Sequence, residues 1–187
     1  MEGPTVDFAP MRQVSDAFLL NMAEVSAALI GLFFVGMFFY VETGFQRAKL
    51  GRAVLARYFR ASTRIVLILY AIPLGLSLAL VVLEPVWARA FFALLSLLLV
   101  AANVDTAIRV RGVAKTIGSM ALLVNEVLGT VGVVVIVVVP WALGGLHPTR
   151  EDLTWAVLLS FATGFLSIGA AVLSAFDIER LEDDHRS

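Results

Sequence analysis

The feature that most constrains the fold is a long apolar run without a charged residue, VSAALIGLFFVGMFFYV at residues 25–41. With the apolar residues before it, this run supplies the about 20 residues that a helix needs to cross the hydrocarbon core of a bilayer. The run begins too late for a cleaved signal peptide, and its basic flank follows it rather than precedes it. The pattern therefore predicts an uncleaved membrane anchor whose N-terminal end lies outside.

Basic residues are concentrated directly after this run. Because cytoplasmic loops of membrane proteins carry an excess of Lys and Arg, we expect the segment to lie inside. Over residues 45–63, apolar side chains fall on one helical face and basic side chains on the other, which is typical of a helix lying along the membrane interface. Anionic lipids of the inner face are its expected partner. The predicted headgroup-binding residues are Arg47, Lys49, Arg52, Arg57, Arg60 and Arg64.

Four further apolar segments follow, so the fold class is an all-α integral membrane protein. Pro73, in the second of the five predicted spans, should kink its helix or leave a carbonyl unpaired unless a neighbouring helix satisfies it. We expect one transmembrane domain, between an extracytoplasmic tail (1–14) and an acidic cytoplasmic tail (177–187). The domain covers residues 15–176, with spans at about 18–42, 65–83, 86–108, 118–141 and 153–176.

The distribution of basic residues predicts the orientation. With the five spans in place, Arg12, Arg89 and Arg150 fall on one side, and the rest of the 14 Lys and Arg residues fall on the other. This asymmetry predicts an outer N-terminus and an inner C-terminus. We expect a multi-pass protein of the plasma membrane, which is the inner membrane of a prokaryote.

Composition excludes several functional classes. The chain of 187 residues is 60% apolar and only 16% charged, whereas charged residues make up about a quarter of a soluble domain. It has no cysteine and only two histidines, so thiol chemistry is excluded and no cofactor or metal site is expected. The basic segment lies against a bilayer, which argues against a nucleic-acid partner. No Ser/His pair, HExxH spacing or phosphate loop indicates an enzyme.

Ionisable residues inside the spans are the candidate functional residues, because a charge at the bilayer centre is costly. One group lies near the outer end of the first span and the other near the cytoplasmic ends of the third and fourth. Such carboxylates could line a path for a cation or a proton. Alternatively, Glu24 reaches the headgroups. The group in the third and fourth spans would then form a polar clamp between helices, or Asp105 would pair with Arg109. The residues are Glu24, Asn21, Glu126, Asn125, Asn103 and Asp105.

Small residues recur at helical spacing in two spans, which allows close helix packing. We expect mostly packing within the chain. The first span carries Ala23, Ala27, Gly31 and Val35, and the fifth carries Ala156, Ser160, Gly164, Ser167, Ala171 and Ser174.

Two functions fit this sequence. The first is a homo-oligomeric channel or conduit for a cation or proton that uses the intramembrane carboxylates. The second is a non-catalytic structural or regulatory subunit that docks on a partner membrane protein through the small-residue seams.

Overall fold

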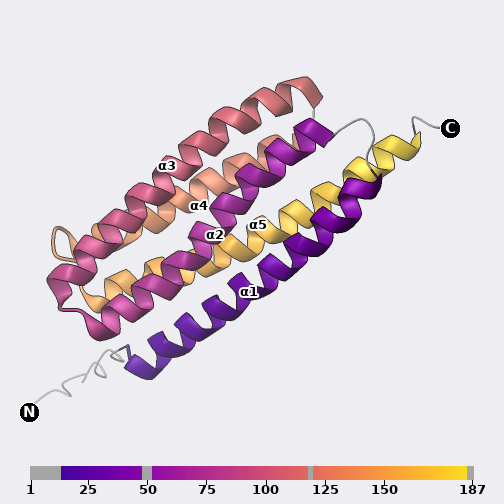
Figure 1. Cartoon of the computed structure of the whole chain (residues 1–187). Coiled ribbons are helices and arrows are strands. Elements are labelled where there is room, and N and C mark those ends of the chain that lie inside the picture. The colour runs from indigo at the N-terminus through magenta and orange to yellow at the C-terminus, as the bar shows by residue number, and fades with distance from the viewer. Residues whose placement is uncertain (1–13, 48–51, 118–119, 185–187) are drawn as a thin grey trace, which may run out of the picture.

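The computed structural model describes the backbone of residues 14–47, 52–117 and 120–184, and the side chains of residues 14–39, 63–108 and 127–169. Within these ranges the chain forms helices and no strand, and consecutive helices run antiparallel (Figure 1). The all-α prediction is therefore confirmed for the described part of the chain. The helices are α1 (Asp16–Arg47), α2 (Arg52–Val82), α3 (Pro85–Ile117), α4 (Met120–Gly144) and α5 (Arg150–Asp184).

Among the described residues, five helices are long and apolar enough to cross a membrane. This number agrees with the five predicted spans. The predicted bounds of the spans stay predictions, because several of them lie outside the residues whose side chains the structure describes. The predicted interfacial helix over residues 45–63 is not confirmed and stays a prediction. In the structure, α2 begins at Arg52 and continues unbroken into the second span. The apolar segments are Asp16–Phe39, Thr63–Val82, Pro85–Ile108, Val127–Gly144 and Arg150–Gly169.

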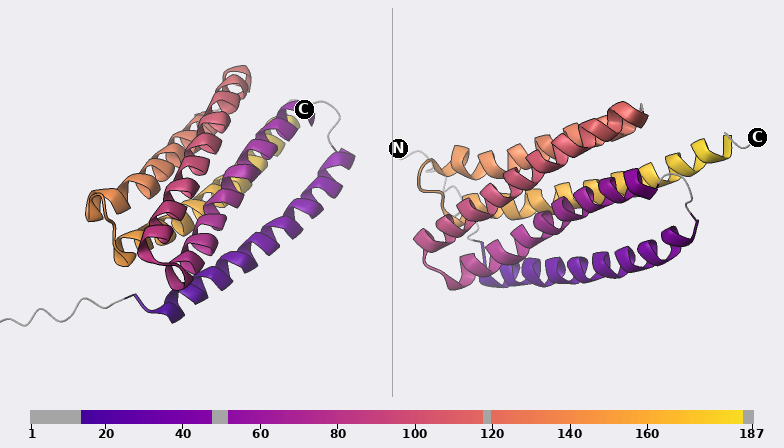
Figure 2. Two further views of the ribbon diagram at one scale, coloured as in Figure 1. Left: turned by 60° about the vertical axis from the view of Figure 1, so that its left-hand side comes forward. Right: turned by 45° about the horizontal axis from the view of Figure 1, so that its top comes forward.

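Helices α2, α3, α4 and α5 form a closed arrangement, which we call the α2–α5 bundle. Each packs against the next along the chain, and α5 returns to pack against α2. Helix α1 lies outside this arrangement and packs mainly along α2, as the two views in Figure 2 show. The outward side of α1 is therefore not covered by the other described helices.

The α2–α3 and α4–α5 connections are short. A two-residue link joins α2 to α3, and the amide of Ala88 donates to the carbonyl of Glu84 at the start of α3. Gly145, which follows α4, has a φ of 59°, the left-handed conformation that glycine adopts easily after a helix. Thr149 and Asp152 then cap α5, because the Asp152 carboxylate accepts hydrogen bonds from the Thr149 amide (2.8 Å) and hydroxyl (2.9 Å).

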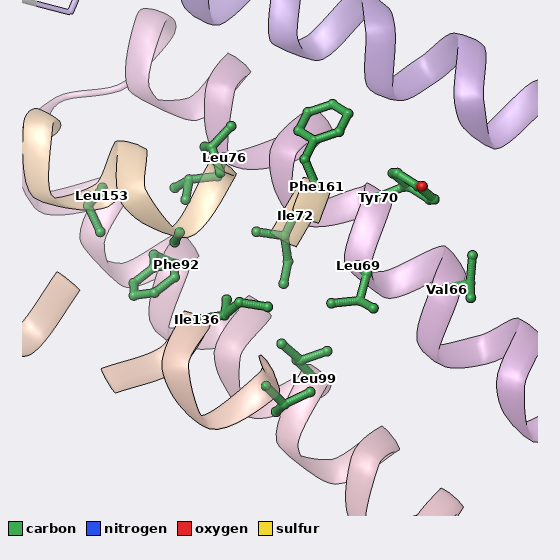
Figure 3. Packing of buried hydrophobic residues seen from close by; sticks show 13 residues of the cluster. Val66, Leu69, Tyr70, Ile72, Leu76, Phe92, Leu99, Ile136, Leu153 and Phe161 are labelled. Carbon is green, nitrogen blue, oxygen red and sulfur yellow. The ribbon is translucent and has the colours of Figure 1, made fainter. Parts of the chain in front are cut away.

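Apolar side chains fill the centre of the α2–α5 bundle (Figure 3). The ring of Tyr70 lies edge-on to Phe161 and Phe165, with centroid distances of 6.0 and 6.2 Å. Gly164 allows this approach, since a Cβ at that position would lie 3.0 Å from Cζ of Tyr70. The core residues are Val66, Leu69, Tyr70, Ile72, Leu76, Phe92, Leu99, Val133, Ile136, Leu153, Ala156, Val157 and Phe161.

Candidate functional site

Two ion pairs lie at opposite ends of the apolar spans. At one end, Arg150 at the start of α5 pairs with Asp16 at the start of α1. At the other end, Arg64 of α2 pairs with Asp105 of α3 at 3.5 Å. Arg64 is roughly 27 Å from the end of α2 at Val82 along the helix axis. This length is close to the roughly 30 Å thickness of a hydrocarbon core. We call the two ends of the helices that carry these ion pairs the Asp16 rim and the Arg64 rim.

The rim that carries Asp16 also contains a contact between α3 and the α4–α5 connection. Nη1 of Arg89 lies 2.8 Å from Nδ1 of His147, and Nε of Arg89 donates to the carbonyl of Pro85 at 2.9 Å. Because a guanidinium only donates, His147 accepts through Nδ1 in this contact. No group of three potential metal ligands occurs among the described residues.

Asn103 and Asp105, two of the predicted site residues, lie near the other rim and contact neighbouring helices. Nδ2 of Asn103 donates to Oγ1 of Thr130 on α4 at 3.4 Å, which joins α3 to α4 as expected for antiparallel neighbours. Asp105 pairs with Arg64, a partner that the sequence did not indicate. Asn125, Glu126 and Arg109 have side chains outside the described ones, so their predicted contacts stay predictions.

Glu24 and Asn21 occupy a different position from Asn103 and Asp105. Both side chains are exposed on α1, on the side that faces away from α2. The opposite side of α1 buries Leu19, Ala23 and Ser26. Within the described residues, neither Glu24 nor Asn21 has a hydrogen-bond or ion-pair partner. The structure therefore does not bring Glu24 together with Asn103 and Asp105.

Of the predicted lipid-binding residues, Arg64 is the one whose side chain the structure describes. This side chain is exposed at the rim. The side chains of Arg47, Lys49, Arg52, Arg57 and Arg60 lie outside the described ones. The Arg64 guanidinium is exposed, and Asp105 neutralises part of its charge.

The small-residue seams have two different environments. In α5, Ala156, Ser160 and Gly164 are buried within the α2–α5 bundle, as expected for packing within the chain. In α1, Ala23 is buried against the bundle, whereas Gly31 is exposed with no atom within 4 Å of a Cβ built on it. The seam predicted in the first span therefore divides between the packed and the outward sides of the helix.

Sequence reasoning missed several polar partners. It did not pair Asp16 with Arg150, although opposite charges at the same end of the helices are a usable signal. It did not select Thr130, which lies on the face that helical spacing gives to Glu126. It also did not select Ser26, whose hydroxyl donates to the backbone carbonyl of Tyr70.

The described helices define a class rather than a family. Length and apolar composition indicate a multi-pass α-helical membrane protein. Comparisons with protein-family models, with curated proteins and with solved structures find no match for the chain.

Proposed function

We propose that the protein is a homo-oligomeric conduit for a cation or a proton, with an outer N-terminus and an inner C-terminus in the plasma membrane. The observation that carries this proposal is the exposed carboxylate of Glu24 within an apolar span. Glu24 lies roughly 12 Å from the Asp16 rim along the axis of α1. At that depth a carboxylate meets lipid, water or another protein chain.

The energetic argument favours water or another chain. A charged side chain that faces lipid costs on the order of 2.5–3.5 kcal/mol at the centre of a span, and less toward its ends. A polar axis between protomers removes this cost, and carboxylates that line such an axis attract cations. The path is placed between protomers because apolar side chains fill the described centre of the α2–α5 bundle.

Glu126 on α4 is the second candidate carboxylate. Helical spacing assigns it to the same face as Thr130 and Val133. Thr130 is half-buried and bonded to Asn103, and Val133 is buried in the core. A carboxylate on this face would lie in the bundle near its cytoplasmic end, away from a path that runs between protomers, so Glu126→Gln tests whether it takes part in ion transfer.

The basic residues between Arg47 and Arg64 support the orientation and a lipid partner. In the proposed topology they lie inside, where anionic lipids attract Lys and Arg. The acidic surface lipids would also raise the local concentration of cations at the inner opening.

A second candidate is a non-catalytic subunit of a larger membrane complex. The observation that favours it is internal pairing, because Asn103 bonds to Thr130 and Asp105 pairs with Arg64. These contacts are those of a polar clamp that holds α2, α3 and α4 together. Glu24 is the residue that this alternative leaves unexplained.

Flux through proteoliposomes tests the proposal. Purified protein is reconstituted, and the flux of protons, monovalent cations and divalent cations is measured for the wild type and for Glu24→Gln and Glu126→Gln. Glu84→Gln is the matched control, since Glu84 is exposed in the link between α2 and α3. We expect flux that falls in Glu24→Gln and is retained in Glu84→Gln. Absence of flux for every ion, or flux indifferent to both intramembrane changes, would remove the conduit.

A further inference from the structure

We propose that the outward face of α1 is the self-association surface, and that its occupant is α1 of a second copy of this chain. This inference rests on the proposed function and specifies the partner that encloses the path. Helix α1 is suited to the role because it lies outside the α2–α5 bundle and packs mainly along α2 (Figure 2).

The outward face combines two polar side chains with small residues. Asn21, Glu24, Ala28 and Gly31 follow one another at helical spacing and are all exposed. A Cβ built on Gly31 has no atom within 4 Å, so this position is open. Small residues let two helix backbones approach closely in a membrane, where packing and hydrogen bonds drive association.

A second copy fits this face because the polar groups are self-complementary. Copies of one membrane protein share an orientation, so equivalent residues lie at the same depth. In a symmetric parallel pair, the Asn21 amide of one protomer is placed to donate to the partner subunit's Glu24, and the reverse contact also forms. Each copy therefore supplies the donor that the other copy's carboxylate lacks.

The same symmetry brings two Glu24 carboxylates close together. Two carboxylates at short range form a strongly negative site, which would hold a cation between its members. The interface would thereby place the ion-binding group of the proposed conduit on the symmetry axis.

The outward face of α4 is the competing surface, and its composition differs. Its exposed described residues include Val127, Leu128, Val131, Val134 and Val138. These aliphatic side chains are compatible with lipid and supply no hydrogen-bonding group. We therefore choose α1 over α4 as the self-association surface because Asn21 and Glu24 supply hydrogen-bonding groups.

Cysteine crosslinking in the native membrane tests the interface. The chain has no cysteine, so single variants give crosslinks without background. Ala28→Cys places a thiol on the proposed face, and Leu97→Cys places one on the exposed side of α3 at a similar distance from the outer rim. We expect oxidation to give a covalent dimer for Ala28→Cys and not for Leu97→Cys. Equal crosslinking of the two variants would overturn the proposal.

A second measurement uses the oligomeric state in lipid nanodiscs. Gly31→Leu should lower the oligomer fraction about tenfold by blocking backbone approach. Gly169→Leu is the control, because Gly169 is also exposed with no atom within 4 Å of a built Cβ. A wild-type protein that is monomeric at all lipid dilutions would overturn the interface. Crosslinking without flux would retain the interface and remove the conduit. Flux without crosslinking at residue 28 would retain the conduit and remove the interface.

Discussion

The hydroxyl of Ser26 on α1 donates a hydrogen bond to the backbone carbonyl of Tyr70 on α2. This contact lies one turn before Pro73, which has no amide N–H to donate to the carbonyl of Leu69 and crowds that carbonyl. The neighbouring helix thus supplies a donor where the proline weakens the hydrogen bonding of α2. The sequence predicted that a neighbouring helix would satisfy a carbonyl freed by Pro73. In the structure, the carbonyl that receives the hydrogen bond from α1 is that of Tyr70 and not that of Leu69.

Replacement of Ser26 by alanine should loosen α1 from α2. We expect Ser26→Ala to lower the free energy of unfolding by about 1 kcal/mol, because a buried carbonyl loses its side-chain partner. Ser77→Ala is the matched control, since the buried Ser77 hydroxyl has no hydrogen-bond partner among the described residues. Denaturant titration in mixed micelles measures both variants. An equal loss for the two serines would contradict a specific role for the Ser26 bond.

Gly164 on α5 should not tolerate a side chain. A Cβ at this position would lie 3.0 to 3.3 Å from three atoms of the Tyr70 ring, and that ring is fully buried beside Phe161. Because the added methyl group would overpack this buried contact, we expect Gly164→Ala to destabilise the protein by about 1–3 kcal/mol. Gly169→Ala on the same helix has no atom within 4 Å of its Cβ and should be close to neutral. Thermal unfolding in detergent distinguishes them, and a stable Gly164→Ala variant would show that the Tyr70 ring can move.

Asp16→Asn should increase local opening at the N-terminal end of α1. The Asp16 carboxylate pairs with Arg150 of α5, and both side chains are partly exposed. An ion pair of this kind contributes up to about 1 kcal/mol, so amide hydrogen exchange over residues 16–20 should rise by up to about fivefold. Exchange over residues 69–76 of α2 is the internal reference. Unchanged exchange near Asp16 would show that the apolar contacts of Leu19 alone hold this end.

Single cysteines report the orientation, since the wild-type chain has none. Leu146→Cys lies in the exposed connection between α4 and α5, and Leu55→Cys lies in the basic segment. In intact cells, we expect a membrane-impermeant maleimide to label residue 146 and to label residue 55 only after permeabilisation. Labelling of residue 55 from outside would reverse the proposed topology and the placement of the lipid-binding arginines.

Apolar patterning determined much of the fold. The uncharged runs predicted five spans. Pro73 predicted that the second span needs a hydrogen-bond donor from a neighbouring helix. Contacts between helices were not predictable in the same way, because periodicity indicates a face but not the neighbour that covers it. For this reason the Asp105–Arg64 pair and the Asn103–Thr130 bond appeared only in the structure. The isolation of α1 outside the α2–α5 bundle, which makes Glu24 the central candidate, also depended on three-dimensional packing.

Charge replacement at residue 24 tests the role of Glu24 in the conduit most directly. Glu24→Cys is reconstituted, and cation and proton flux is measured before and after reaction with an anionic methanethiosulfonate or with a neutral one of similar size. We expect Glu24→Cys to lower the flux at least about tenfold, the equivalent of 1.36 kcal/mol in the barrier. Recovery with the anionic reagent but not the neutral one would assign the path to cations, and loss without recovery would assign it to protons. Flux in Glu24→Cys equal to that of the wild type and indifferent to both reagents would contradict the role of Glu24.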